Sequence, residues 1–243
     1  MTDAAPRARE VVVLADPGAL SRAAAERVAG DADDAIRRSG RFTIALAGGT
    51  TPRALYELLA GEYRPLVDWT HTEVFFGDER GVPPDDAASN YAMARDALLA
   101  RVPVGRVHRI AGERPPADAA RAYDAELRAA FPDDGAPTFD VALLGLGADG
   151  HTASLFPGGA ALDERTAWAV AVPPPESAAP HVERVSLTLP ALNRARAVYL
   201  LASGAEKRPV VRRVLAGADP DLPAARVRGV ERTVWLLDRD AAG

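Results

Sequence analysis

The sequence predicts an α/β layered fold in which helices flank a mostly parallel β-sheet. Short apolar runs alternate with helical stretches along nearly the whole chain, as expected when strands and helices follow one another. Residues 139–144 form an unbroken apolar run, which is typical of a strand buried on both faces of a parallel sheet. With 243 residues and neither an internal repeat nor a low-complexity linker, we expect a single domain over residues 1–243.

The individual elements follow from the spacing of apolar residues. Helical spacing predicts a helix over 20–36, with Gly40 just beyond its end, and further helices over 52–59, 89–99 (Ser89 near its cap), 117–131 and 205–215. Apolar runs predict strands at 11–14, 42–46, 73–76, 139–144, 167–172, 184–189, 197–201 and 233–237. In open α/β sheets the ligand lies beyond the carboxyl ends of the strands, so those loops are where we expect the site.

Composition excludes several classes of protein. The chain has no cysteine, which excludes disulfides, zinc–thiolate sites, Fe–S clusters and a cysteine nucleophile. The net charge of −5 argues against a general nucleic-acid binder. No apolar run approaches a membrane span, and the start of the sequence lacks the apolar core of a signal peptide. We therefore expect a cytoplasmic protein without nucleic-acid or membrane partners, either a monomer or a small homo-oligomer.

The first candidate site is the turn Gly48-Gly49-Thr50-Thr51, which links a predicted strand to a predicted helix. Two glycines let backbone N–H groups approach an anion, and the helix N-terminus adds free donors and a favourable dipole. We expect Thr51 to be the N-cap and Pro52 the first helical residue. The turn lacks the Gly-Lys-Ser/Thr of a P-loop. A tight turn with an ordinary cap is the alternative.

The second candidate is a group of charged residues at the end of the strand 73–76. Asp78 and Arg80 come directly after this strand and can point toward one pocket, although a solvated loop would have the same composition. Asn90 follows shortly afterwards, beside the cap Ser89. Asp85 and Asp86 fit solvated loop or cap positions better than ligand positions.

The third candidate is the glycine-rich loop that follows the strand 139–144. Its three glycines match a dinucleotide fingerprint, but Asp149 places a carboxylate where a pyrophosphate would lie, Pro157 shortens the next helix, and the acidic residue about 20 positions later is missing. The loop instead presents Asp149 and His151, with His151 where a general base would be placed. A loop histidine that caps backbone groups is the alternative. A metal site of Asp149, His151 and Asp78 is disfavoured, because the chain has four histidines and no ligand pair at helical spacing.

Lysine usage adds a further candidate. The chain has 28 arginines and one lysine, Lys207, which indicates a role that arginine does not fill, although it could also be a lysine that escaped codon drift. Lys207 falls in the first turn of a predicted helix, where a positive charge is unfavourable unless an anion binds there. The remaining histidines, His71, His108 and His181, fit structural or solvated positions.

Together these segments resemble the glucosamine-6-phosphate isomerase/6-phosphogluconolactonase family. The resemblance runs from about residue 11 to residue 238 and includes Arg184 with the following Thr188-Leu189-Pro190. It implies a Rossmann-like sandwich and the hydrolysis of a small-molecule sugar-phosphate lactone, 6-phospho-D-glucono-1,5-lactone, to 6-phospho-D-gluconate in the oxidative pentose phosphate pathway. It implies no metal and no organic cofactor.

The resemblance also implies roles for the candidate residues. His151 would be the base, and Asp149 or Asp78 would orient it. Loop backbone N–H groups or Arg80 would stabilise the oxyanion. Asn90 belongs to the substrate-binding set, and the 6-phosphate would lie on Gly48–Thr51 with Arg184 and Lys207.

Two other functions are compatible with such a sequence. Glucosamine-6-phosphate deaminases of this superfamily carry a glutamate near the end of the histidine loop, where this chain reads Ser154-Leu155-Phe156-Pro157. The missing carboxylate disfavours deamination. A non-catalytic sugar-phosphate sensor usually has a separate DNA-binding domain, for which we see no room in 243 residues.

Overall fold

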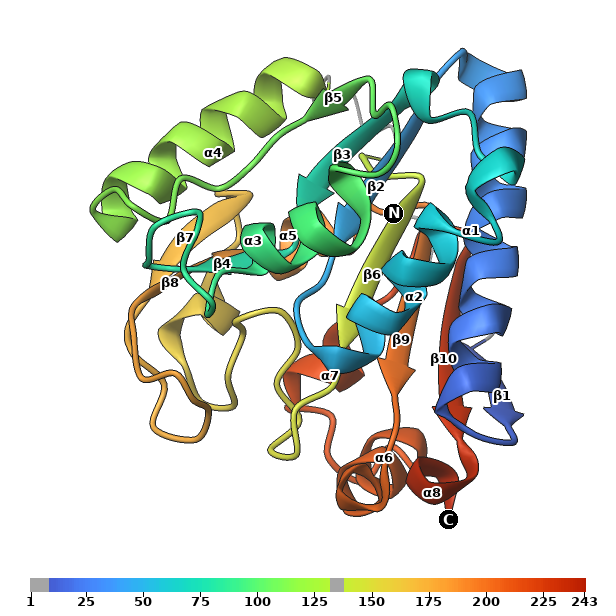
Figure 1. The fold of residues 1–243 in the computed structure, drawn as a ribbon. Coiled ribbons are helices and arrows are strands. Elements are labelled where there is room, and N and C mark those ends of the chain that lie inside the picture. The colour runs from blue at the N-terminus through green and yellow to red at the C-terminus, as the bar shows by residue number, and fades with distance from the viewer. Residues whose placement is uncertain (1–8, 132–137) are drawn as a thin grey trace, which may run out of the picture.

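A large parallel sheet forms the frame of the protein, which we describe from a computed structural model over residues 9–131 and 138–243. Within these residues the sheet has seven strands, and every pair is parallel. In spatial order they are β1 (Arg9–Leu14), β10 (Arg232–Asp238), β9 (Ala197–Ala202), β6 (Val141–Gly145), β2 (Phe42–Leu46), β3 (Thr72–Phe76) and β5 (Arg106–Val107) (Figure 1). The predicted α/β fold with a mostly parallel sheet is confirmed.

A second, antiparallel sheet stands beside the first and was not predicted. In the described part of the chain it has three strands, β4 (Asp78–Arg80), β8 (Arg184–Leu187) and β7 (Ala169–Val172). The runs predicted at 167–172 and 184–189 therefore belong to a separate sheet. Residues 78–80, expected in a loop, pair with β8 instead. Three residues are too few for a sequence pattern to reveal such a strand.

Helices cover both sheets. In chain order they are α1 (Pro17–Ser39), α2 (Thr50–Ala60), α3 (Asn90–Ala94), α4 (Pro116–Ala130), α5 (Leu189–Leu192), α6 (Arg208–Leu215), α7 (Pro223–Arg226) and α8 (Arg239–Ala242). Helices α1 and α2 pack against each other in front of the large sheet, and α4 packs on the small sheet (Figure 1). Helix α1 ends at Ser39, and Gly40 lies just beyond its end as predicted, with a left-handed φ of 76°. None of the helices within the described residues is long and apolar enough to cross a membrane.

Two predicted helices are divided. The predicted helix 89–99 is α3, capped by Ser89 as expected, followed by a π-helical turn over Arg95–Leu99. The predicted helix 205–215 consists of a 3₁₀ turn, Ala205–Lys207, followed by α6. Pro209 explains this second division. Its ring removes an N–H donor and fixes φ, which suits the first positions of a helix rather than the interior.

Two buried tyrosines fix the strand ends that lead into the candidate site. The Tyr56 hydroxyl donates to the carbonyl oxygen of Ala47 (2.8 Å) and accepts from its N–H (2.9 Å). The Tyr123 hydroxyl donates to the carbonyl oxygen of Phe76 (3.0 Å) and accepts from its N–H (2.9 Å). Both side chains are fully buried, and burial raises the pKa of each above its usual range. The ends of β2 and β3 are therefore held by neutral hydroxyls.

Candidate active site

The candidate site lies where the carboxyl ends of four neighbouring strands meet. Strands β9, β6, β2 and β3 lie side by side and run parallel, so the loops that follow them emerge at one edge of the sheet. The segments at these strand ends, including β4 after β3, contain most of the residues singled out in the sequence (203–207, 145–151, 47–51 and 77–80). Ligands of open α/β sheets bind at this edge.

His151 forms a chain of hydrogen bonds with Asp149 and Ser177. Nδ1 of His151 lies 2.6 Å from Oδ1 of Asp149, and the Ser177 hydroxyl donates to Oδ2 of Asp149 at 2.5 Å. Burial raises the pKa of Asp149, but the hydrogen bonds from His151 and Ser177 lower it by more, so that this pKa lies below its usual range. Asp149 is therefore ionised at neutral pH.

The ionised Asp149 determines which nitrogen of His151 is free. A carboxylate can only accept, so Nδ1 carries the hydrogen and Nε2 of the neutral ring keeps its lone pair. Across the described residues, Nε2 has no hydrogen-bond partner. The Phe156 ring packs on the imidazole with 4.6 Å between ring centroids. The side chain of His151 is partly exposed, and an oriented imidazole with a free nitrogen is the arrangement that a general base requires.

Glycines allow the loop to place His151 beside Asp149. A Cβ on Gly147 would lie 2.0 Å from Nδ1 of His151, so no larger residue fits there, and Gly150 has a left-handed φ of 91°. The N–H of Gly147 donates to the carbonyl oxygen of His151 (2.9 Å), and the N–H of Gly150 donates to that of Gly147 (3.0 Å). These donors are used inside the loop, which reduces what the loop backbone can offer a ligand.

Asp78 is buried, and its carboxylate is occupied away from His151. Its Oδ1 accepts from the Asn90 amide (3.0 Å), and its Oδ2 accepts from the Ser154 hydroxyl (2.6 Å). Of the two carboxylates considered for orienting the histidine, Asp149 contacts the ring; in the described structure no hydrogen bond joins Asp78 to it. The residues that the structure describes contain no cluster of three or more acidic or histidine side chains that could hold a metal ion.

Arg80 and Arg184 face each other across the small sheet, where they are register partners in β4 and β8. Arg80 donates to Oδ1 of Asn90. Nε of both arginines is buried and lacks a partner in the described part of the structure. Burial lowers the pKa of Arg184, Asp78 partly counteracts this, and Arg80 lowers it further. Because like charges opposite each other destabilise a strand pair, an anion beside these arginines would be stabilising.

The turn Gly48–Thr51 differs from its predicted form in one respect. Helix α2 begins at Thr50 and its N-cap is Gly49, with a φ of 104°, so the prediction of Thr51 as N-cap and Pro52 as first residue was wrong. A glycine N-cap has no side chain to accept from the first N–H groups, which leaves these donors for a ligand. Gly48 also touches the neighbouring segment: a Cβ there would lie 1.8 Å from Oδ1 of Asn90.

Lys207 lies in the 3₁₀ turn before α6, not in the first turn of a continuous helix as predicted. It is half-buried, and its amine has no hydrogen bond or ion pair with any residue for which the structure gives a position. Its loop adjoins the His151 loop because β9 pairs with β6. Lys207 thus follows a strand that ends at the same edge, and among the described residues no hydrogen bond joins its side chain to Arg184 or to Gly48–Thr51.

Sequence reasoning missed several residues at this edge. Ser177 lies 28 positions after Asp149 in a Pro-rich connection, and no local pattern points to its contact with that carboxylate. Glu79, which lies between Asp78 and Arg80, accepts from the backbone N–H groups of Asn90 (2.7 Å) and Tyr91 (2.8 Å) at the start of α3. Burial raises its pKa and these hydrogen bonds partly counteract that rise. Glu79 is therefore a structural anchor for Asn90.

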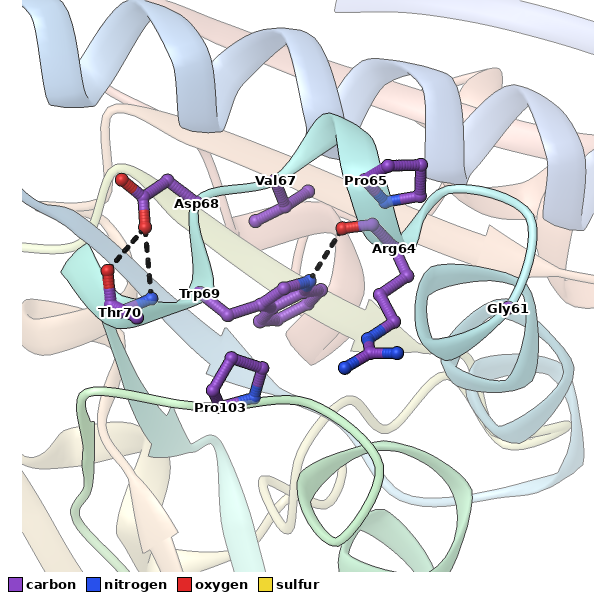
Figure 2. Close-up of a pocket in the computed structure, with 8 residues that line it drawn as sticks. All are labelled: Gly61, Arg64, Pro65, Val67, Asp68, Trp69, Thr70 and Pro103. Carbon is purple, nitrogen blue, oxygen red and sulfur yellow. Dashed lines mark hydrogen bonds between the residues drawn. The ribbon is translucent and has the colours of Figure 1, made fainter.

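A hollow of about 490 Å³ lies elsewhere on the molecule (Figure 2). It involves the chain between α2 and β3, at the amino end of β3 rather than at the carboxyl edge. Eight residues line it: Gly61, Arg64, Pro65, Val67, Asp68, Trp69, Thr70 and Pro103. None of them is among the site residues predicted from the sequence.

Comparison with known proteins gives a consistent result. The family model for glucosamine-6-phosphate isomerases/6-phosphogluconolactonase matches residues 15–235. A 6-phosphogluconolactonase of Mycobacterium tuberculosis is 42% identical over 96% of each chain. The solved structure of a 6-phosphogluconolactonase from Trypanosoma brucei has a TM-score of 0.86 and 34% identity, and the match covers 98% of each chain.

A more distant structure shares the fold alone. This monomeric glucosamine-6-phosphate deaminase has a TM-score of 0.79, but it is 22% identical to the present chain. Matches over nearly the whole length, at 42% and 34% identity, show the family directly. This chain belongs to the glucosamine-6-phosphate isomerase/6-phosphogluconolactonase family.

Proposed function

We propose that this enzyme hydrolyses 6-phospho-D-glucono-1,5-lactone to 6-phospho-D-gluconate in the oxidative pentose phosphate pathway of the cytoplasm. The names of its well-matched relatives support this reaction. The structural observation that carries the proposal is the 2.6 Å contact between His151 Nδ1 and the ionised Asp149, with Nε2 left free at the carboxyl edge of the sheet. All the groups required come from one chain, so the proposal holds for a monomer as well as for a small homo-oligomer.

In the proposed mechanism, His151 activates water. Nε2 removes a proton from a water molecule as the water oxygen attacks the lactone carbonyl carbon, and Asp149 stabilises the imidazolium that forms. The tetrahedral intermediate then breaks the bond between the carbonyl carbon and the ring oxygen. That oxygen takes the proton from Nε2 and becomes a hydroxyl group. The product carboxylic acid ionises in water, so atoms and charge balance and the histidine returns to its neutral form.

Arg80 is the group that we favour for stabilising the oxyanion. The alternative was the backbone of the glycine loop, but the N–H groups of Gly147, Gly150 and His151 already donate within that loop. Arg80 retains a buried Nε without a partner in the described structure. A preorganised cationic donor in a partly buried site stabilises a developing oxyanion more than water does. Asn90, which accepts from Arg80, holds the guanidinium in place.

The 6-phosphate is assigned to the Gly48–Thr51 turn, Arg184 and Lys207. The N-terminus of α2 lacks a side-chain cap, and the amine of Lys207 forms no ion pair within the described residues. A dianion supplies the missing acceptors and favours a helix N-terminus. Arg184, almost fully buried and with an unpartnered Nε, would gain an opposite charge beside it. The assignment explains how a chain with a net charge of −5 binds an anion.

Deamination of glucosamine 6-phosphate is disfavoured by the surroundings of His151. Near the end of the histidine loop, where the deaminases carry a glutamate, the stretch Ser154-Leu155-Phe156-Pro157 has no carboxylate, and the Phe156 ring packs on the imidazole. An assay that compares the two substrates tests the proposal. We expect lactone hydrolysis well above the spontaneous rate and no ammonia from glucosamine 6-phosphate. Ammonia release at a rate that rivals lactone hydrolysis would overturn the proposal.

A further inference from the structure

A side-chain hydrogen bond joins the connection between β7 and β8 (residues 173–183) to the His151 loop. Ser177 is exposed, yet its hydroxyl lies 2.5 Å from Oδ2 of Asp149. The connection belongs to the small sheet, whereas Asp149 follows β6 of the large sheet. The Ser177–Asp149 hydrogen bond therefore links the two sheets at the group that orients the histidine.

Hydrogen bonds from Arg184 hold this connection in place. Its guanidinium donates to the carbonyl oxygens of Ala178 (3.2 Å) and Pro180 (3.1 Å), immediately after Ser177. Within the connection, Nδ1 of His181 lies 2.7 Å from the carbonyl oxygen of Pro175. Ser177 is thus presented to Asp149 by a segment that has its own anchors, although the serine itself is solvent-exposed.

Ser177 supplies the hydrogen bond to one of the two carboxylate oxygens of Asp149. Oδ1 accepts from Nδ1 and from the backbone N–H of His151, while Oδ2 accepts from Ser177. With Oδ2 unbound, the carboxylate could rotate, and its oxygen would no longer be fixed against Nδ1. Small displacements of a catalytic group are costly because the reacting atoms must be aligned.

We propose that Ser177 is a positioning residue, which fixes Asp149 and through it the imidazole of His151, from a connection that Arg184 anchors. This inference rests on the proposed role of His151 as the base. It assigns Ser177 no contact with substrate, so its effect belongs in the catalytic step rather than in binding. Because Arg184 holds the connection that carries Ser177, it would both bind the phosphate and help to position the base.

Substitution of Ser177 tests the inference. We expect Ser177→Ala to lower kcat about tenfold with KM unchanged, the lower end of what loss of a hydrogen bond to a charged group costs. Ser177→Thr keeps the hydroxyl and should restore kcat, because the exposed position has room for the extra methyl group. A readout independent of activity is NMR of the Nδ1 proton of His151, which should exchange with water faster in Ser177→Ala than in wild type or Ser177→Thr.

The chain contains a matched control. The hydroxyl of Thr70 donates to Asp68 (2.6 Å), which also contacts Nδ1 of His71 (2.8 Å), but this exposed group lies beside the hollow at the amino end of β3 (Figure 2). Thr70→Ala removes the same kind of hydrogen bond far from the proposed site. We expect it to leave kcat, KM and the Nδ1 proton of His151 unchanged.

The outcomes separate this inference from the proposed function. Wild-type kcat and unchanged proton exchange in Ser177→Ala, together with an inactive His151→Gln, would overturn the role of Ser177 alone. An active His151→Gln would overturn the base itself. A rise in KM without a fall in kcat would place Ser177 in substrate binding and would also contradict the inference.

Discussion

The four histidines of the chain differ in what their ring nitrogens contact. Both nitrogens of the buried His108 face carboxylates, with Nδ1 2.6 Å from Glu126 and Nε2 3.2 Å from Glu73. His71 and Asp68 form a pair like that of His151 and Asp149, but both are exposed and lie away from the carboxyl edge. Nδ1 of His181 is also held, 2.7 Å from the carbonyl oxygen of Pro175, so His151 is distinguished by having a carboxylate at Nδ1 and lying in a loop at that edge. Position in the fold, rather than the pair of residues, distinguishes the proposed base.

Asp149→Asn tests the orientation of this base. An amide either donates to Nδ1 or accepts from it without charge, so the imidazolium of the transition state loses its counter-charge. We expect kcat to fall by about 10²- to 10⁴-fold, the range that general-base catalysis contributes. Steady-state kinetics with the lactone measures this loss. Asp78→Asn, at the carboxylate that does not contact His151, is the comparison, and an equal or larger effect on kcat there would argue against Asp149.

The pH dependence of stability provides a check on the same residue. The folded-state pKa of Asp149 is depressed, so its ionised form stabilises the fold above the pKa of an unfolded aspartate, about 3.9. That contribution is lost as the pH falls below this value. The difference in unfolding free energy between wild type and Asp149→Asn should shrink as the pH is lowered below about 3.9, because Asp149 then becomes protonated in the unfolded state. A difference that keeps growing below this pH would contradict the assigned direction of the pKa.

Lys207→Met tests the phosphate assignment. Loss of one charge-assisted contact should cost about 1.5–3 kcal/mol, or roughly 10- to 150-fold in kcat/KM, mainly through KM. Arg212→Met, on the exposed surface of α6, is the control for a change of charge nearby. Because Lys207 and the α-amino group are the amines of this sequence, an amine-selective reagent gives a second measurement. Complete labelling of Lys207 with an unchanged KM would show that it does not bind the phosphate.

At the scale of elements, the turn between β2 and α2 connects the proposed phosphate site to the small sheet. Gly48 lies against Asn90, whose amide donates to Asp78 and whose oxygen accepts from Arg80. A side chain at position 48 would therefore displace the residue that holds two other members of the site. The glycine is required by close approach rather than by an unusual φ.

Gly48→Ala should lower both activity and stability. The added Cβ would lie 1.8 Å from Oδ1 of Asn90, and such overpacking costs about 1–3 kcal/mol. Gly30→Ala, on the open surface of α1 with nothing near the new Cβ, should instead stabilise the protein by about 0.5–1 kcal/mol. Thermal unfolding of both variants measures the contrast. A stable and fully active Gly48→Ala would contradict the packing described here.

The same elements indicate how far sequence patterns reach. The strand at residues 42–46 and the cap at Ser89 were predicted as observed, because each depends on neighbouring residues. The small sheet was missed because β4 has three residues and pairs with a strand about 100 positions later. The contact of Ser177 was missed for the same reason, since it depends on how two sheets are placed. Patterns of neighbouring residues thus predicted elements and caps, whereas contacts between distant segments depend on tertiary packing that such patterns do not reveal.

At the scale of the whole molecule, the proposed site draws on both sheets. The large sheet supplies His151, Asp149 and the Gly48–Thr51 turn, and the small sheet supplies Arg80 and Arg184. A ligand that contacts both should therefore stabilise the native protein as a unit. A ligand that binds only the native state raises the free energy of unfolding by about 2.7 kcal/mol when its concentration is 100-fold above Kd.

Ligand-dependent unfolding tests this prediction. We expect 6-phosphogluconate to raise the Tm, gluconate without the phosphate to have little effect, and Lys207→Met to weaken the response to 6-phosphogluconate. Scans at matched ionic strength separate specific binding from general salt effects. Equal stabilisation by phosphorylated and unphosphorylated gluconate would contradict a dedicated phosphate site.

The measurement that tests the central claim most directly is lactone hydrolysis by His151→Gln beside wild type, corrected for spontaneous hydrolysis. Glutamine keeps a polar side chain of similar reach but cannot take a proton from water. We expect a folded variant, with the same circular dichroism, whose kcat is lower by about 10²- to 10⁴-fold. A folded His151→Gln with kcat within about threefold of wild type would show that His151 is not the base, since such a change is far smaller than the loss of a general base.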